Sequence, residues 1–263
     1  NPQLCKITGY KAKELIGENP RIVKSGHTPE IQFKNMWNAI TSGQSWSGEL
    51  YNKKKNGDLF WENVTVSPIK NSENKSTHYL AIKEDISLRK DYEERLLYQA
   101  SYDKLTDLPN RTLAYDRIQQ AIANAIREEK HIALLYMDFD HFKNINDTYG
   151  HDFGDVVLST FGKRLAGKIR MTDYAFRFGG EEFMVLLPHT NSYGAEKMAW
   201  KICKSNEKEG FTTANHKITV TISIGLASFH QHQPSDQKDL LVMADKALYA
   251  AKENGRNRVE TYR

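Results

Sequence analysis

The sequence is poor in the features that define several protein classes. Its 263 residues include only two cysteines, Cys5 and Cys203, too few for a disulfide scaffold or a cysteine zinc site. No run approaches the ~18 apolar residues of a transmembrane helix, so we expect no membrane segment. The 37 basic residues barely exceed the 33 acidic ones, which gives no reason to expect a nucleic-acid partner. The low cysteine content fits a reducing compartment, so a cytoplasmic location is expected.

What is present is the composition of a folded chain. Apolar residues make up 39% and charged residues 27%, enough to bury a sizeable core and to exclude a disordered chain. At roughly 150 residues per domain, the length favours two domains. The patterns described below place them at 1–86 and 102–263, joined by a helical linker at 87–101. The predicted fold class is α/β (α+β).

The first part of the chain predicts an antiparallel sheet with flanking helices. Some of its segments carry apolar residues at helical spacing, and others carry them at the alternating spacing of a strand. Asn56-Gly57 lies between two predicted strands and is a strong hairpin signal. The expected helices are 29–40 and 86–100, and the expected strands are 46–51, 59–69 and 77–85.

The second part alternates helices with strands. The run from Ile132 to Met137 is almost continuously apolar, as in a strand that is buried on both faces. The helical segments each carry one apolar stripe. The expected helices are 113–129, 152–170, 192–208 and 239–252, and the expected strands are 131–137, 174–178, 183–187 and 218–229.

Two acidic clusters in the second part point to chemistry. Asp138-Phe139-Asp140 follows the buried strand, at the end where open α/β sheets place ligands. Carboxylates there suit Mg²⁺, although Asp140 could equally be a helix N-cap. Gly179-Gly180-Glu181-Glu182 joins two strands, and its glycines allow a tight turn and close approach of a bulky anion. Its carboxylates could complete a metal site or form an ordinary charged turn.

Six segments of the second part share their order and spacing with a known family. They are Asp103–Arg111, Met137–Asp147, Tyr149–Asp155, Arg177–Phe183, Val220–Gly225 and Ala244–Asn257. They resemble the GGDEF family of diguanylate cyclases, which join two GTP molecules into cyclic di-GMP, in its Gly-Gly-Glu-Glu-Phe variant. The resemblance covers about 102–263. It implies a central sheet wrapped by helices, like the palm of polymerases and nucleotidyl cyclases.

The resemblance assigns a metal and catalytic site to the two acidic clusters. Asp138 and Glu181 match the family's Mg²⁺ carboxylates. The main-chain carbonyl of Phe139 matches a further ligand, and Glu182 lies beside them as a catalytic candidate. We therefore expect Mg²⁺ as the cofactor of the second domain.

The resemblance also assigns the nucleotide contacts. Asn146 and Asp155 match the guanine-reading pair, and a carboxylate can accept from guanine N1–H and its amine, which adenine cannot supply. Lys252 and Arg256 match the cations that hold the triphosphate. The remaining phosphate contacts match Phe142 and Lys143.

Two further positions of the second domain are notable. Arg170 and Asp173 lie where the family has its inhibitory product site for cyclic di-GMP, although such a pair can also be a surface ion pair. Asp107 stands where the family commonly has glycine. Because Asp107 lies outside the metal site, little effect is expected.

The first part of the chain resembles a PAS domain over about 1–88. The resemblance rests on Leu15–Arg21, Trp46–Asn52, Asn56–Asp58 and Ile82–Ile86. It begins inside the family pattern, whose first two strands would precede Asn1, so we expect the chain to be a fragment.

The PAS pattern leaves its ligand open. Trp46 and Asn52 lie in a pattern similar to that of flavin-binding sensors, which suggests FAD with Trp46 against its ring. The domain could instead be an empty dimerising module with Trp46 and Trp61 in its core. A haem ligand at His27 is a third interpretation.

The sequence as a whole predicts a diguanylate cyclase with a sensory input, acting as a homodimer because its reaction joins two GTP molecules. One alternative is a catalytically silent GGDEF domain that serves as a cyclic di-GMP receptor. The other is a scaffold that dimerises through the PAS domain.

Overall fold

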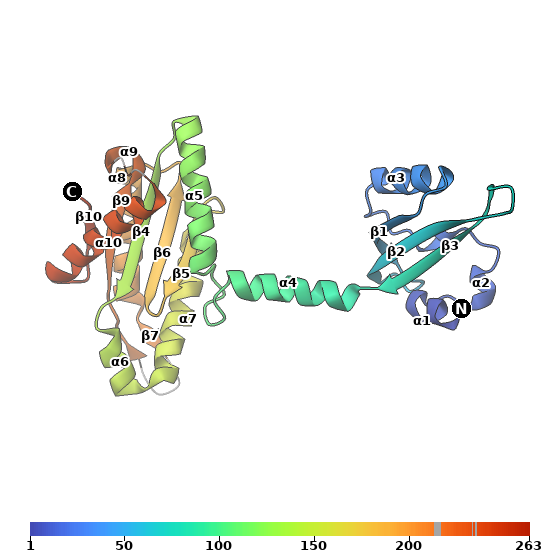
Figure 1. The fold of residues 1–263 in the computed structure, drawn as a ribbon. Coiled ribbons are helices and arrows are strands. Elements are labelled where there is room, and N and C mark those ends of the chain that lie inside the picture. Colours follow the sequence, from blue (N-terminus) through green and yellow to red (C-terminus); the bar gives the residue numbers. More distant parts are fainter. Residues whose placement is uncertain (213–216, 233, 235) are drawn as a thin grey trace. The chain divides into compact units, whose positions relative to one another are not determined.

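The computed structural model describes residues 1–212, 217–232, 234 and 236–263 (Figure 1). The chain divides into two compact units, Asn1–Leu96 and Leu97–Arg263. Each unit is described by itself below.

The first unit is built on an antiparallel sheet with the order β1-β2-β3. The predicted hairpin between β1 and β2 is confirmed, and its turn uses Gly57 at φ 96°. The elements are α1 (Pro2–Thr8), α2 (Ala12–Leu15), the 3-10 helix η1 (Pro20–Val23), α3 (Glu30–Thr41), β1 (Trp46–Lys53), β2 (Leu59–Lys70) and β3 (Ser76–Asp85).

One face of this sheet carries the core of the first unit. Side chains of β2 alternate between buried and partly exposed from Phe60 to Val66, as expected for a sheet with one covered face. Ile40 of α3 packs there with Leu50, Val64 and Val66. The predicted antiparallel sheet with flanking helices is therefore confirmed.

The predicted linker helix is α4 (Ser87–Ser101). At its start, the Trp61 N–H donates to Ser87 Oγ, and Glu49 forms ion pairs with Arg89 at 2.8 Å and Lys90 at 2.6 Å. These contacts fasten the first turn of α4 to the sheet of the first unit.

The second unit contains a mixed five-stranded sheet with the order β10-β9-β4-β6-β5. Its strands are antiparallel except β10, which is parallel to β9. All residues of β4 are buried, as predicted. The strands are β4 (Ile132–Phe139), β5 (Tyr174–Gly179), β6 (Glu182–Pro188), β9 (Ile222–Ser228) and β10 (Val259–Thr261), with a separate hairpin of β7 (Phe211–Thr212) and β8 (Lys217–Ile218).

Helices cover both faces of this sheet, each over its own core (Figure 1). On one face, α7 and α8 pack on Leu135, Met137 and Phe139 of β4. On the other face, α5 and α10 pack on Leu134 and Tyr136. The helices are α5 (Arg111–Glu128), α6 (Phe142–Tyr149), α7 (His151–Lys168), α8 (Ser192–Glu209), α9 (Phe229–His232) and α10 (Gln237–Glu253). This confirms the predicted sheet wrapped by helices.

The strand expected over 218–229 is confirmed over β9 and interrupted before it, because the chain breaks between β8 and β9. The Val220 carbonyl accepts from Asn206 Nδ2 at 2.6 Å, and the Thr221 carbonyl accepts from the Asp140 N–H at 2.9 Å. The Val220 carbonyl is therefore bonded to a side chain, whereas the bond from Asp140 to Thr221 extends the β4–β9 pairing by one residue.

Asp107, in the place of the family's glycine, has a left-handed backbone with φ 62°. This conformation favours glycine, which gives the family preference a physical reason. The Tyr98 hydroxyl donates to the Asp107 carboxylate, and the Tyr98 ring stacks on Tyr102 at 4.5 Å between centroids. The last turn of α4 is thereby fastened to the loop before α5.

No helix among the described residues is long and apolar enough to cross a membrane.

Gly225 of β9 provides a test of the packing between β9 and α10. A Cβ at this residue would lie 2.1 Å from the Ala244 carbonyl oxygen and 2.2 Å from the Leu248 nitrogen. Because both atoms belong to the helix backbone, Gly225→Ala should cost about 3 kcal/mol or more. Thermal unfolding should show a Tm lower by about 10 °C.

The matched control is Gly167→Ala near the end of α7, where a Cβ would meet nothing within 4 Å. This change should be neutral or stabilise by about 0.5–1 kcal/mol. A Gly225→Ala protein as stable as the parent would show that α10 does not pack this closely on β9.

Candidate active site

Two carboxylates and a lysine meet at the end of β4. Asp138, the penultimate residue of β4, pairs in register with Glu182 of β6 and Ser223 of β9. Glu181 lies in the turn between β5 and β6. Lys252 comes from the last turn of α10, and its Nζ lies 2.7 Å from Asp138 Oδ1. The structure thus brings together three of the predicted site residues.

Burial perturbs both carboxylates. The pKa of Asp138 is raised by burial, a shift that Lys252 opposes and the charge of Asp140 reinforces. The pKa of Glu181 is raised by burial and by the charge of Asp138, against the opposing effect of Lys252. Two partly desolvated acids beside one another favour either protonation or a bound cation.

The donor set fits a magnesium ion. Among the described residues, no group of three or more His, Cys, Asp or Glu side chains is placed to hold a metal. Mg²⁺ does not require such a group, because it commonly uses one or two carboxylates together with water and substrate phosphates. Asp138 and Glu181 supply two carboxylates, and a bound Mg²⁺ would have to share Asp138 with the ammonium of Lys252.

Glu182 has a partner that the sequence did not reveal. Burial raises the pKa of Tyr136, and the nearby carboxylate of Glu182 raises it further. Tyr136 and Asp138 are two residues apart on β4 and therefore lie on the same face of the sheet. The alternation along β4 could have placed Tyr136 near the site, but could not show that Glu182 of the neighbouring strand affects it.

The predicted guanine readers lie on adjacent helices. Asn146 is on α6 and Asp155 is on α7. Asn146 Oδ1 is buried and has no hydrogen-bond partner within the described part of the chain. A Cβ on Gly154 would lie 2.0 Å from this oxygen, so only glycine lets the Asn146 side chain take this position. A buried acceptor of this kind calls for a donor from a ligand or water, while Asp155 is exposed.

The remaining phosphate candidates differ in exposure. The Phe142 side chain is buried and contacts the Phe139 ring at 5.6 Å between centroids, so only its main chain could face a phosphate. Lys143 is exposed in the first turn of α6. Arg256 is exposed in the turn after α10, with a left-handed backbone at φ 60°.

Asp140 is neither a helix cap nor part of the pair of acids at the end of β4. The N-cap of α6 is His141, so the expected capping role of Asp140 is wrong. The Asp140 carboxylate is buried and accepts three hydrogen bonds from other segments.

Arg170 and Asp173 form a tight turn. Asp173 is buried, and its carboxylate accepts from the main-chain N–H of Arg170 at 3.0 Å. The Arg170 guanidinium is exposed and forms no ion pair with Asp173, so the alternative of a surface ion pair between them is wrong. Asp173 therefore shapes the turn, and the Arg170 side chain lies at the surface.

Trp46 and Asn52 of the first unit lie on the same face of β1 but at its opposite ends. Trp46 packs against the apolar core, close to Gly48. Asn52 Nδ2 donates to the buried Glu62 carboxylate at 2.6 Å, and Lys83 Nζ lies 2.7 Å from the same oxygen. The sequence did not reveal this polar group of Asn52, Glu62 and Lys83.

Comparisons with known proteins agree with this architecture. Residues 100–258 match the model of the family described as "Diguanylate cyclase, GGDEF domain". The chain belongs to the GGDEF family. Residues 1–87 match a PAS domain, so the GGDEF domain follows a PAS domain, as predicted.

Curated relatives and solved structures show the extent of the likeness. Diguanylate cyclase DosC of Escherichia coli K12 is 35% identical over 210 residues, which cover 76% of this chain and 45% of DosC. Diguanylate cyclase A of Treponema denticola is 40% identical over 168 residues, covering 63% of this chain and 45% of that protein. This chain therefore spans less than half of either relative.

Two solved structures have the same GGDEF fold. The coiled coil and GGDEF domain of DgcB from Caulobacter crescentus, in complex with c-di-GMP, match with a TM-score of 0.62 and 28% identity, covering 67% of this chain and 93% of that one. The active GGEEF domain of a diguanylate cyclase from Vibrio cholerae matches with a TM-score of 0.55 and 35% identity, covering 59% and 98%.

The raised pKa of Glu181 in the GGDEF domain predicts a pH-dependent stability. Because the pKa is higher in the folded than in the unfolded chain, ionising Glu181 costs folding free energy as pH rises through the folded pKa. Glu181→Gln should therefore raise Tm at pH 7.5 in EDTA. The gain should disappear as pH falls below 4.5, the ordinary pKa of the group.

Glu196→Gln on the exposed side of α8 is the control and should leave Tm unchanged. If the Glu181→Gln protein melts at the parent temperature at pH 7.5, Glu181 is not destabilised by its surroundings.

Proposed function

We propose that this chain is a diguanylate cyclase that converts two GTP into cyclic di-GMP and two pyrophosphates. The observation that carries the proposal is the pair of partly desolvated carboxylates, Asp138 and Glu181, with Lys252 Nζ 2.7 Å from Asp138. Its relatives named diguanylate cyclase support the same activity.

Different residues would bind the metal ion, the triphosphate and the guanine. Asp138, Glu181 and the Phe139 carbonyl would hold Mg²⁺, which supplies charge neutralisation at the phosphates and helps to ionise the attacking hydroxyl. Lys252 and Arg256 hold the triphosphate by charge-assisted hydrogen bonds. Asn146 and Asp155 bind the guanine, and the unpartnered Asn146 oxygen supports this role.

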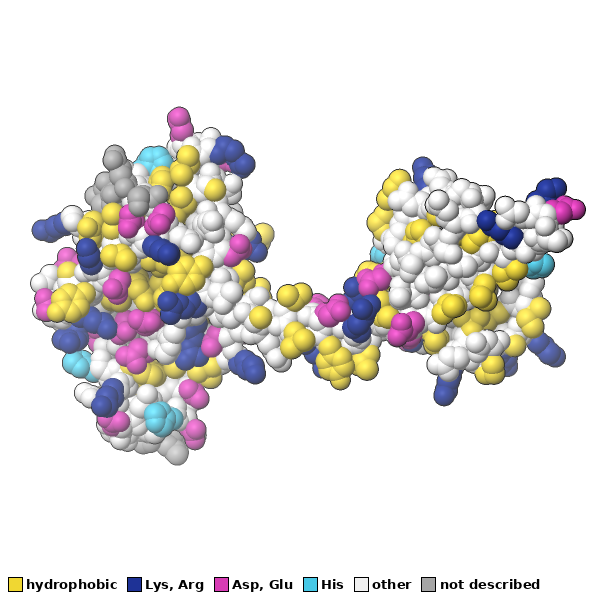
Figure 2. All heavy atoms as spheres, viewed as in Figure 1, with side chains coloured by type: hydrophobic (Ala, Val, Ile, Leu, Met, Phe, Trp, Pro, Cys, Tyr) yellow, Lys and Arg dark blue, Asp and Glu magenta, His cyan; other side chains and the backbone are white. Residues whose placement is uncertain are grey.

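The reaction requires two copies of the domain, each carrying one GTP, because the 3′-hydroxyl of one attacks the α-phosphate of the other. The chain therefore acts as a homodimer. Apolar side chains on α4 support this arrangement, since Leu88, Tyr92 and Leu96 are four residues apart and exposed. Figure 2 shows hydrophobic side chains at the surface of this helix. A change in the PAS domain could reach the GGDEF domain through this helix.

Product analysis tests the activity. Incubation with GTP and Mg²⁺ followed by chromatography should show cyclic di-GMP. Glu181→Ala should reduce turnover by about 10³-fold or more, since it removes a group that stabilises charge in the transition state. Glu196→Ala, an exposed change on α8, should leave turnover unchanged. Full activity of Glu181→Ala with Mg²⁺ would refute the ligand role of Glu181.

The exposed Arg170 favours a second role, binding of cyclic di-GMP at an inhibitory site. Its guanidinium can bind a phosphate or stack on guanine. If no cyclic di-GMP is formed but the chain binds it, the GGDEF domain is a receptor instead of an enzyme.

Arg170→Ala should weaken inhibition by added cyclic di-GMP about tenfold or more, the effect of losing one charged contact, and leave the uninhibited rate intact. Lys163→Ala, an exposed cation on α7, is the control and should leave the inhibition curve unchanged. An unchanged curve for Arg170→Ala would exclude Arg170 from product binding.

A flavin in the PAS domain stays a prediction. Trp46 and Asn52 both lie on the covered face of β1, but the amide of Asn52 is already bonded to Glu62. A flavin in contact with Asn52 would therefore have to share or displace this bond.

A further inference from the structure

The turn that carries Arg256 has an unfavourable backbone. Arg256 and Asn257 are consecutive and both left-handed, at φ 60° and φ 46°. L-residues other than glycine rarely adopt this conformation, and two in succession persist only when the surroundings hold them. The contacts that hold this turn therefore determine where Arg256 stands.

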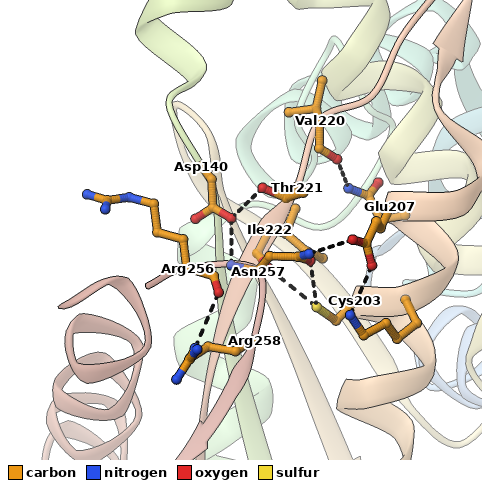
Figure 3. A network of polar contacts seen from close by, with 11 residues as sticks. Asp140, Cys203, Glu207, Val220, Thr221, Ile222, Arg256, Asn257 and Arg258 are labelled. Atoms are coloured by element: carbon orange, nitrogen blue, oxygen red, sulfur yellow. Dashed lines mark hydrogen bonds and ion pairs between the residues drawn. The ribbon is translucent and has the colours of Figure 1, made fainter. Parts of the chain in front are cut away.

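One of these contacts comes from Asp140, which accepts from the Asn257 N–H (Figure 3). The Asp140 side chain is only 5% exposed. One oxygen accepts from Ser223 Oγ at 2.6 Å, and the other accepts from Thr221 Oγ1 at 2.7 Å and from the Asn257 N–H at 3.0 Å. Asp140 thus ties the end of β4 to the start of β9 and to the turn after α10.

The Asn257 side chain is held from a second direction by α8. Its Nδ2 donates to Glu207 Oε1 at 2.7 Å, and its Oδ1 accepts from Cys203 Sγ at 3.5 Å. Figure 3 shows Asn257 between Asp140 and these two residues of α8. Its main chain and its side chain are therefore both fixed.

We propose that Asp140 is a positioning residue for Arg256. It accepts the Asn257 N–H and so holds the left-handed turn that aims Arg256 at the triphosphate. The inference rests on the proposed function, which gives Arg256 its phosphate-binding role.

Asp140 differs from the acids of the proposed metal site in its hydrogen-bond partners. Asp138 lies beside the ammonium of Lys252. Both Asp140 oxygens are instead occupied by neutral donors, and no ion pair involves it among the described residues. Three of the roughly four acceptor positions of the Asp140 carboxylate are thus used within the fold, which is what a positioning residue requires.

This difference makes the conservative variant informative. In Asp140→Asn, the amide oxygen can still accept from the Asn257 N–H and Thr221, and the amide nitrogen can donate to Ser223 Oγ. In Asp140→Ala, all three bonds are lost. A positioning role therefore predicts that Asn rescues what Ala loses, while a metal ligand would be impaired by both changes.

Calorimetric binding of two probes tests the proposal: a non-hydrolysable GTP analogue with Mg²⁺, and GMP, which lacks the β- and γ-phosphates. Asp140→Ala should weaken binding of the analogue about tenfold or more, and should leave GMP binding within about twofold. Asp140→Asn should bind both probes within about twofold of the parent.

Asp140→Ala that binds the analogue like the parent would overturn the proposal. Equal losses in both variants, with a higher Mg²⁺ requirement, would also overturn it.

A second pair of variants keeps the test valid if Asp140→Ala fails to fold. Asn257→Gly and Asn257→Val both lose the bonds to α8, but only glycine tolerates φ 46°. Valine should weaken binding of the analogue about tenfold relative to glycine, with equal GMP binding. Equal binding of the analogue by the two variants would show that the backbone of the turn does not position Arg256.

Arg256→Ala separates this inference from the proposed function. If Arg256→Ala binds the analogue like the parent, the phosphate-binding role of Arg256 is wrong. The positioning role of Asp140 is then wrong as well. If Arg256→Ala is weakened and Asp140→Ala is not, only the positioning role is wrong. Adding Asp140→Ala to Arg256→Ala should weaken binding no further, because both changes act on one contact.

Discussion

The pairing of β4 with a strand on each side is the constraint on which the site depends. β4 is hydrogen-bonded to β6 and β9 and is buried over its whole length. Because residues on a strand alternate between faces, the registers with β6 and β9 place Asp138 opposite Glu182 and Ser223. A register shift of one residue would turn Asp138 to the other face and separate it from Lys252.

Much of this arrangement could be predicted from local sequence. The apolar run of β4 predicts a strand that is buried on both faces, and the acids at its end predict a ligand site. The predicted hairpin around Gly57 is also confirmed, because its signal depends on only two adjacent residues.

What could not be predicted depends on partners far apart in the chain. Asp140 and Asn257 are 117 residues apart, so no local pattern shows that one holds the other. The break between β8 and β9 depends on Asn206, which takes the Val220 carbonyl. The effect of Glu182 on the pKa of Tyr136 acts between two strands. Each of these features follows from the packed fold and not from the residues beside it.

The two separate cores of the GGDEF domain have a consequence for how its binding can change. Asn146 and Asp155 come from α6 and α7, whose apolar side chains belong to one core, whereas Lys252 belongs to α10, which packs on the other. Under the proposed roles, the base would be held from one face of the sheet, whereas the phosphates would be held from both faces, because Lys252 belongs to α10 and the turn of Arg256 is fixed by α8. A substitution in the core shared by α6, α7 and α8 should therefore affect base and phosphate binding together, whereas one beneath α10 should affect the phosphates alone.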